Sequence, residues 1–451
     1  MGTDRPHVTI FTNFTNYDPA YSLIRVAKDQ IKMLKRHGYE VSVIVAESFV
    51  PHGVFSEDIL EKIPNVPCHN EVKKDPTFEE DVTAIEKRLE AIFKKRKTKV
   101  CITQDIVYKP SELKHQMALR RLLDKKPSDI TFLHWINSAT PPITLNNLMG
   151  VFKDEYLKVF EKPISNSYYV FFNDISKDMI AKNFNVGTDR VRIVHHPSDL
   201  DEVYGVNDSN LSRFISKREV YQADAICVYP IRLDRGKQVQ FPIKTMAKVK
   251  ELGMDVRMIV VDFHSSGGDK VTYRDELKQM ALDWGLTPKE IAFTSDFCNE
   301  WKVNVPHEVV LSLFRMSNVF IMSSVSESYS LITQEAALNK NLIVLNQDFP
   351  PFRDIFGKDA IFRKYSSNWD IMAGYDEANR DGSHTETKYG PGNISDAERE
   401  RTHEPAYHKQ TAAQIVDKLK NDIEMAMGIR IRKERNLDYV FKNELEQLLY
   451  L

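Results

Sequence analysis

The regular alternation of short apolar runs with stretches of helical periodicity is the feature that most constrains how this chain folds. In the first fifty residues, the apolar run 8–11 precedes apolar side chains at helical spacing between Leu23 and Leu34, and a second apolar run follows at 41–45. Gly38 stands before that second run, where helices commonly end in a left-handed residue. Two strands joined through one helix lie parallel, so the pattern predicts a βαβ unit.

The same unit recurs along most of the chain. One series continues to about residue 134 and a second runs from 225 to 345, with a connector at about 200–222. We therefore predict two Rossmann-like, doubly wound parallel-sheet α/β domains, 1–205 and 206–430, with ligands bound at the carboxyl ends of the strands. Residues 371–408 combine Gly and polar side chains without an apolar period, which predicts a loop insertion.

Composition excludes several classes of protein. Lys plus Arg (62) nearly balance Asp plus Glu (64) over 451 residues, which disfavours a protein that is basic over its whole surface. The four cysteines lie at least 33 residues apart, which excludes closely spaced zinc or redox pairs. The sequence has no run of 18 apolar residues, so we predict no membrane span. The first residues lack the apolar core of a signal peptide. The expected location is the cytoplasm.

The sharpest functional signal lies between residues 319 and 346. Glu327 follows a predicted strand, and Glu335, eight residues later, falls within the next predicted helix. A helix N-terminus offers unpaired N–H groups and a partial positive charge that suit a phosphate, and nearby carboxylates accept hydrogen bonds from sugar hydroxyls. The arrangement predicts a ligand that combines phosphate with a polyol. The alternative is a helix-capping Glu beside an unrelated surface Glu.

The spacing of these two glutamates resembles the Glu-x7-Glu motif of retaining GT-B glycosyltransferases, most closely glycosyltransferase family 4. Serines stand where that family usually has two glycines, and small side chains still let backbone approach the donor. The resemblance implies a catalytic role for Glu327. It further implies donor contacts from the loop and helix start, at Ser328, Tyr329, Ser330, Leu331 and Glu335.

Arg232 and Lys237 extend the resemblance. They follow the first strand of the second series with the family's five-residue step from Arg to Lys. The resemblance implies that both hold the donor diphosphate and are catalytic, because they neutralise the charge that grows on the leaving nucleotide. A solvated basic turn is the alternative. Phe293 and Thr294 resemble the strand-end segment that meets the nucleobase.

The resemblance covers residues 160–365 best, and it implies more than the donor site. It implies a GT-B fold whose two domains face a cleft, with a C-terminal helix at 431–451 that packs back on the first domain. It also implies a nucleotide-diphosphate sugar as co-substrate, no obligatory metal, and a front-face displacement with retention in which the donor phosphate helps to deprotonate the acceptor.

The first domain matches the family less well. His134 matches a family histidine that contacts the donor sugar, with a purely structural histidine as the alternative. The loop after the first strand lacks the family's glycines, so it is expected to serve the acceptor. The acceptor residues predicted around these strand ends are Asn13, Asn16, Asp105, Tyr108 and Trp135.

The segment 94–126 carries a local excess of positive charge. It holds eleven Lys and Arg against three acids, a net charge of +8 in a chain of −2. A polyanionic acceptor such as DNA, or an anionic membrane surface, fits this excess, and a solvated helix face with a basic turn is the alternative. Segments such as 133–136 and 346–351 are similar to glycosyltransferases of tailed bacteriophages, some of which modify hydroxymethylated bases of DNA. This resemblance makes phage DNA a candidate acceptor and the host cytoplasm the matching location.

Two other functions stay open beside a hexosyl- or pentosyltransferase. A nucleotide-sugar epimerase or a phosphorylase fits the same architecture, because a fold does not fix a reaction. A module that binds a nucleotide sugar without transferring it is the second.

Overall fold

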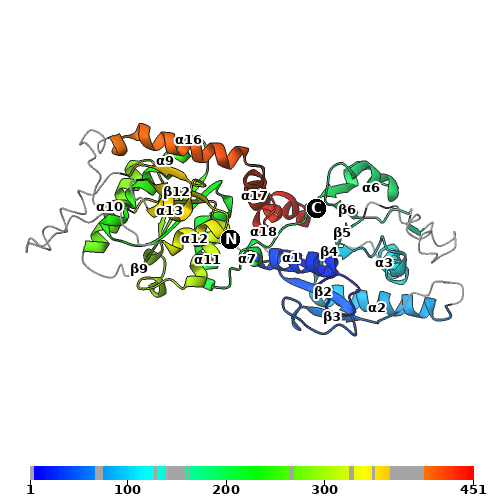
Figure 1. Ribbon diagram of the computed structural model, residues 1–451. Helices are drawn as coiled ribbons and strands as arrows, with labels where there is room; N and C mark the ends of the chain where they lie inside the picture. Colours follow the sequence, from blue (N-terminus) through cyan, green and yellow to red (C-terminus); the bar gives the residue numbers. More distant parts are fainter. Residues whose placement is uncertain are drawn as a thin grey trace, which may run out of the picture. The chain divides into compact units, whose positions relative to one another are not determined.

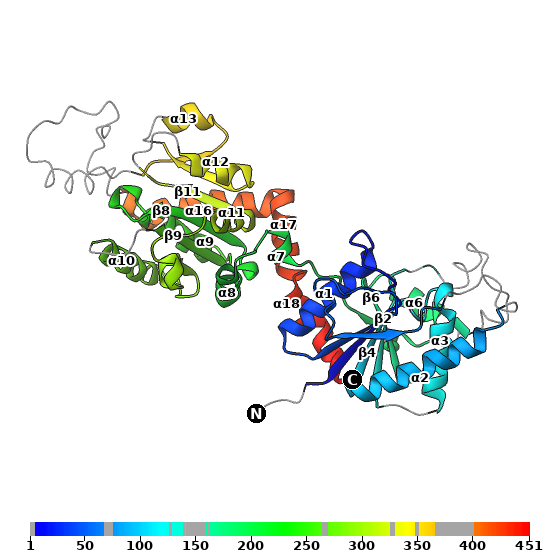
Figure 2. The same cartoon turned by 90° about the horizontal axis from the view of Figure 1, so that it is seen from below.

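The computed structural model describes residues 5–66, 75–125, 129–138, 140, 159–160, 162–263, 269–324, 330–347, 351–365 and 401–451. The chain divides into two compact units (Figures 1 and 2). Unit 1 consists of residues 1–199 together with 435–451, and unit 2 consists of residues 200–434.

A parallel sheet forms the centre of unit 1. Its described strands stand in the order β3-β2-β1-β4-β5-β6-β7. They are β1 (His7–Phe11), β2 (Val41–Ala46), β3 (Leu60–Ile63), β4 (Thr98–Gln104), β5 (Thr131–Trp135), β6 (Ser167–Phe171) and β7 (Val191–Ile193). The order runs outward in both directions from β1 and β4, so the sheet is doubly wound.

Successive strand residues point to opposite sides of this sheet, and apolar side chains lie on both sides. Helices therefore cover both faces. Val8 and Ile10 of β1 pack in the core under α1 (Ser22–Arg36), whereas Phe11 packs in the core under the helices of the other face. Those helices are α2 (Phe78–Arg96), α3 (Leu113–Lys125) and α6 (Lys177–Asn183). Burial on both faces explains why these strands read as nearly continuous apolar runs.

The C-terminal segment is part of unit 1. It holds α18 (Leu437–Val440), a π-helical turn (Phe441–Leu445) and a 3-10 helix (Glu446–Tyr450), whose apolar side chains join the core under α1. Phe441 stacks on His37 with ring centroids 3.9 Å apart. The Tyr39 and Tyr450 hydroxyls lie 2.9 Å apart in a hydrogen bond. These contacts fix the segment on the same sheet face as α1.

Asp29 of α1 gives a test of packing on that face. Its side chain is 5% exposed, and the guanidinium of Arg25 lies 4.0 Å away. Burial raises its pKa to about 6; Lys28 opposes the shift and Asp199, which pairs with Lys32, adds to it. The folded state therefore holds the proton more tightly than the unfolded state, whose pKa is near 3.8, so stability falls as pH rises from about 4 to 6.

We expect Asp29→Asn to be more stable than the parent at pH 7.5, by about 2 kcal/mol, because the amide carries no charge to bury. Near pH 4 the two proteins should unfold at the same denaturant concentration. The exposed Glu57, changed to Gln, is the matched control. A stability gain that is equal at both pH values would contradict the burial argument.

Unit 2 is built on a second parallel sheet, with described strands in the order β10-β9-β8-β11-β12-β13. The strands are β8 (Ala225–Arg232), β9 (Val256–Phe263), β10 (Ile291–Phe293), β11 (Val319–Met322), β12 (Leu342–Asn346) and β13 (Ile361–Arg363). The helices are α7 (Leu200–Val203), α8 (Ser209–Arg218), α9 (Gln240–Glu251), α10 (Asp269–Asp283), α11 (His307–Met316), α12 (Leu331–Leu338), α13 (Pro351–Phe356), α16 (Pro405–Asn421) and α17 (Ile423–Glu434). This sheet is also doubly wound, outward from β8 and β11.

The two sheets confirm the predicted fold class of two Rossmann-like, doubly wound parallel-sheet α/β units. The connector predicted at 200–222 contains a regular helix, α8, which Asp208 caps by accepting a hydrogen bond from the N–H of Leu211. One expectation needs correction at its end. The insertion predicted at 371–408 lies outside the described residues up to 400, and its last residues already belong to α16, which starts at Pro405. Pro405 stands at the first helical position, where its missing N–H costs no hydrogen bond within the helix. The apolar pattern of the sequence did not reveal this helix start.

Candidate functional site

The order of strands in unit 2 reverses between β8 and β11. From β8 the chain continues outward through β9 and β10, and from β11 it continues through β12 and β13. Ligands of open α/β sheets bind at this switch point, beyond the carboxyl ends of the two strands. β8 ends at Arg232 and β11 ends at Met322, so the loops after these residues form the candidate site of unit 2.

Hydrogen bonds join these two loops. The Ser323 hydroxyl donates to the carbonyl oxygens of Lys237 at 3.1 Å and Gln238 at 2.9 Å, and the Tyr229 hydroxyl donates to the same Lys237 carbonyl at 2.9 Å. The Lys237 ammonium donates to the Ser324 hydroxyl at 3.5 Å. The cation is thereby held where the chain leaves β11.

Arg232 is the last residue of β8 and lies at the carboxyl end of that strand. Its side chain is 58% exposed, and its Nε donates to Asp234 at 2.5 Å. An exposed pair of this kind contributes little to stability. The guanidinium can therefore exchange this partner for an anionic ligand at small cost.

Glu327, predicted to be catalytic, lies outside the described residues with Ser328 and Tyr329, and its role stays a prediction. The chain is described again at Ser330, which caps α12 in the left-handed region with φ 72°. Its hydroxyl lies 2.8 Å from that of Thr333, and Leu331 beside it is exposed. In chain order α12 is the next helix after β11, and phosphate binding at its N-terminus stays a prediction.

Glu335 lies on α12 and contacts the start of the preceding helix. Its Oε1 is 3.0 Å from His307 Nε2, the first residue of α11, and the imidazole is largely exposed. The carboxylate keeps a second oxygen for another donor, such as a hydroxyl. Its predicted donor contact stays a prediction.

Phe293 and Thr294, predicted at the nucleobase, are buried; Phe293 is the last residue of the edge strand β10 and Thr294 follows it. Thr294 Oγ1 donates to a carboxylate oxygen of Asp262 at 3.2 Å, and the backbone N–H of Ser295 donates to the same oxygen at 2.9 Å. The Ser295 hydroxyl donates to the second oxygen at 2.5 Å. These hydrogen bonds tie the segment after β10 to Asp262 of β9, and the nucleobase contact stays a prediction.

Unit 1 has its own switch point, between β1 and β4. A cavity of about 150 Å³ lies there, between the loop after β1 and the loop after β4. Its polar lining is Asn13, Thr15, Asn16, Asp18, Tyr21, Gln104, Lys109 and Glu112. The structure thus brings together two of the five predicted acceptor residues, Asn13 and Asn16.

The other three predicted acceptor residues lie in the interior. Asp105, Tyr108 and Trp135 are buried, and none of them lines this cavity. Asp105 has a left-handed backbone, φ 56°, and its Oδ1 accepts from the backbone N–H and side-chain amide of Asn137, at 3.0 and 3.2 Å. Burial raises the pKa of both Asp105 and Tyr108. Their acceptor roles stay predictions, and in this conformation Asp105 supports the turn after β4.

Glu112 and Gln104 are among the cavity residues that the sequence analysis did not predict. Glu112 directly precedes α3, and an acid at such a position is usually interpreted as a helix-capping residue. The sequence alone therefore does not mark it as a cavity residue. The available signal was topological, because the segment follows β4, the strand beside β1.

His134, the predicted contact of the donor sugar, lies inside unit 1 with no exposed surface. Its Nδ1 is 2.9 Å from the Thr103 hydroxyl, and its Nε2 has no hydrogen-bond partner within the described residues. Burial, with Arg120 and Arg190 nearby, lowers its pKa to about 3, so the ring is neutral at physiological pH. The catalytic assignment stays a prediction, and the observed burial favours the structural alternative.

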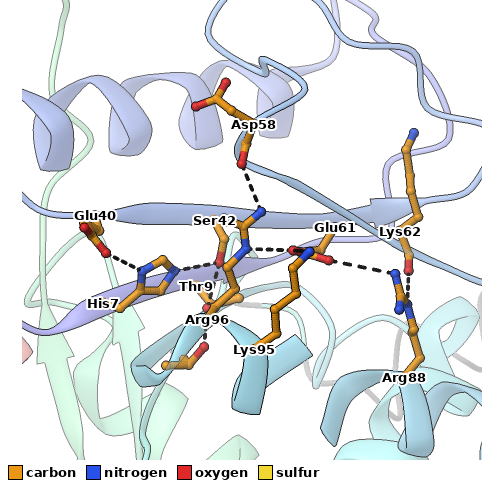
Figure 3. A network of polar contacts seen from close by, with 11 residues as sticks. His7, Thr9, Glu40, Ser42, Asp58, Glu61, Lys62, Arg88, Lys95 and Arg96 are labelled. Carbon is orange, nitrogen blue, oxygen red and sulfur yellow. Dashed lines mark hydrogen bonds and ion pairs between the residues drawn. The ribbon is translucent and has the colours of Figure 1, made fainter. Parts of the chain in front are cut away.

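Acids from other parts of unit 1 pair with much of the basic segment 94–126. The buried Glu61 of β3 accepts from Lys95 and Arg96 of α2, each at 2.7 Å (Figure 3). The ammonium of Lys114, itself buried, lies 2.7 Å from a carboxylate oxygen of Asp75 and of Asp81. Further along α3, Arg121 pairs with Glu79 and Lys125 with Glu86. Five of the eleven basic residues in this segment are therefore paired with acids from outside it.

No protein-family model and no curated protein matches this sequence. Solved structures that resemble it include a glycosyltransferase from Rickettsia africae, with 14% identity over 98% of this chain and 100% of that chain and a TM-score of 0.31. HepE from Anabaena, in complex with UDP, has 12% identity over 99% and 100% with a TM-score of 0.32. A UDP-forming trehalose-phosphate synthase from Burkholderia xenovorans has 12% identity over 99% of each chain, also with a TM-score of 0.32. Values this low leave the fold to rest on the strand order itself.

Proposed function

We propose that the chain is a glycosyltransferase that moves a sugar from a nucleotide-diphosphate sugar to an acceptor hydroxyl. The observation that carries the proposal is the meeting of two loops at the switch point of unit 2. The loop with Arg232 and Lys237 contacts the loop that leads to α12, through Ser323 and Ser324. The sequence motifs assign donor binding to these same two loops.

In this proposal the diphosphate lies between the two cations and the N-terminus of α12. Arg232 offers several N–H donors in one plane, and Lys237 offers a compact positive charge. Both interactions strengthen as the bond to the sugar breaks and negative charge moves onto the diphosphate, so they lower the barrier as well as bind the donor. Glu335 and Glu327 would accept hydrogen bonds from donor hydroxyls.

The proposal includes retention of configuration. The acceptor oxygen would bond to the anomeric carbon on the face from which the diphosphate departs, and the acceptor proton would pass to the departing phosphate oxygen. No protein nucleophile and no obligatory metal enter this scheme. The GT-B arrangement of a donor domain and an acceptor domain is part of the same proposal.

The charges of unit 1 bear on which acceptor the proposed transfer uses. Five of the eleven basic residues that favoured DNA are paired with acids from other parts of unit 1, which weakens the electrostatic case for a polyanion. Hydroxymethylated phage DNA therefore becomes one arm of a test. A bacteriophage origin and a host-cytoplasmic location stay predictions from sequence. No helix within the described ranges is long and apolar enough to cross a membrane.

Incubation of the full chain with a panel of UDP-, GDP- and dTDP-sugars tests the proposal. We expect slow hydrolysis of at least one donor, with release of the nucleoside diphosphate and free sugar. An epimerase would change the sugar and leave the nucleotide sugar intact. A phosphorylase would act on a sugar phosphate only, and a binding module would bind a donor without turnover. Any of these three outcomes would refute the transferase.

A further inference from the structure

Glu112 faces the cavity at the switch point of unit 1. It is the last residue of the short 3-10 helix Pro110–Glu112, which follows β4 and leads directly into α3. Its Oε2 accepts from the Asn13 amide at 3.0 Å, so it joins the loop after β1 to the loop after β4. The cavity volume of about 150 Å³ equals roughly five waters, which gives room for one small ring.

The surroundings of Glu112 keep it ionised and in place. His115 Nδ1, from the first turn of α3, lies 3.1 Å from Glu112 Oε2. Burial alone would raise the pKa of Glu112, but His115, Asn13 and Lys109 outweigh it and hold that pKa below its usual value. An ionised carboxylate can only accept hydrogen bonds, so it selects a ligand that brings O–H or N–H donors.

The remaining polar lining offers both hydrogen-bond donors and acceptors. Lys109 donates to the Tyr21 hydroxyl at 2.7 Å and lies 3.8 Å from Asp105, so its charge is already engaged. The buried side-chain oxygen of Asn13 has no hydrogen-bond partner within the described residues. Asp18 adds a second carboxylate to the lining. Two carboxylates against one paired cation repel phosphates and suit an uncharged polyol.

We propose that this cavity binds the sugar ring of a neutral carbohydrate acceptor, with Glu112 accepting hydrogen bonds from its hydroxyls. The inference rests on the proposed function, since it names the acceptor class of that transfer. His115 is a positioning residue in it, because it holds the Glu112 carboxylate and does not line the cavity.

The experiment uses the full chain, the donor selected by hydrolysis, and two kinds of acceptor. The methyl glycosides of glucose, galactose and mannose form one arm, and a duplex oligonucleotide containing 5-hydroxymethylcytosine forms the other. We expect transfer to a methyl glycoside. Glu112→Gln should raise the acceptor KM by roughly 10- to 100-fold, the effect of losing a charged hydrogen bond.

Donor hydrolysis without acceptor serves as the internal control for folding and for the donor site. It should stay within about twofold in Glu112→Gln, since that substitution affects the acceptor only. Glu80→Gln on α2, an exposed acid of the same unit, should leave both rates unchanged, and Glu112→Asp should recover part of the acceptor affinity.

Several results would overturn the inference. They are transfer to the duplex alone, donor hydrolysis with no transfer to any glycoside, an unchanged acceptor KM in Glu112→Gln, and a parallel loss of donor hydrolysis in that variant. Absence of turnover of every donor by the parent protein is a different result, because it refutes the proposed transferase itself.

Discussion

Replacing Lys237 by alanine is expected to lower kcat/KM for the donor by roughly 100- to 1000-fold, the usual cost of removing one group that stabilises developing charge. The ammonium lies beside Ser324 at the carboxyl end of β11, where the proposed diphosphate binds. Because charge on the leaving group grows in the transition state, most of the loss should appear in kcat, with a smaller rise in KM.

The substitution should leave the local fold intact. The contacts that hold the loop, from Ser323 and Tyr229, use the backbone carbonyl of Lys237, which alanine keeps. Lys302→Ala, at an exposed position of the same unit, is the matched control and should behave as the parent. Lys237→Arg should restore part of the rate. A kcat/KM within about threefold of the parent in Lys237→Ala would remove the diphosphate role.

Replacing Lys114 by methionine is expected to destabilise unit 1 by about 3–5 kcal/mol, the cost of breaking a buried ion pair from one side. The ammonium is only 2% exposed and lies between Asp75 and Asp81. Asp75 is almost as deeply buried, and it also accepts from the backbone N–H and hydroxyl of Thr77. Without the cation, its charge would have no compensating partner of equal strength.

Unfolding by urea at pH 7 measures this effect, and a double variant separates its causes. Because Lys114 holds the pKa of Asp75 below its usual value, the loss should shrink as pH falls and that carboxyl becomes protonated. Asp75→Asn combined with Lys114→Met should recover much of the stability. Lys125→Met, whose ammonium is 66% exposed in its pair with the buried Glu86, should cost less than Lys114→Met. An equal loss in both single Lys variants would contradict the buried pairing.

The sequence predicted the βα rhythm well because parallel strands buried on both faces are short apolar runs. The strand predicted before Glu327 is observed as β11, and the helix predicted around Glu335 is observed as α12. Gly38, expected at a helix end, follows α1 with φ 76°. The start of α16 was missed, since it depends on a capping position inside a polar stretch.

The candidate site was predictable where it follows from strand order. Arg232 and Lys237 lie after β8, and the glutamate loop lies after β11, so adjacency of these two strands brings the motifs together. Residues after β4 and β5 were harder, because a strand end does not reveal which side chains turn inward. Asp105 takes a left-handed conformation and turns into the interior, while Glu112, further along, reaches the cavity.

The basic segment shows what a local count of charge leaves out. The excess of Lys and Arg between 94 and 126 reads as a surface for a polyanion, but its partners lie earlier in the chain. Glu61 on β3 contacts Lys95 and Arg96 more than thirty residues away (Figure 3). Only the packing of α2 on the sheet and of α3 beside α2 makes this pairing visible, so a local count of charge could not find it.

The most direct test of the proposed transfer is the stereochemistry of its first turnovers. The chain would be mixed with the donor that it hydrolyses, and the sugar product and the nucleoside diphosphate would be followed together by proton NMR before the free sugar equilibrates. We predict one nucleoside diphosphate released per sugar, with the product sugar keeping the anomeric configuration of the donor. A product of inverted configuration would contradict the retaining mechanism, and failure of every nucleotide sugar to release its diphosphate would contradict the proposed function.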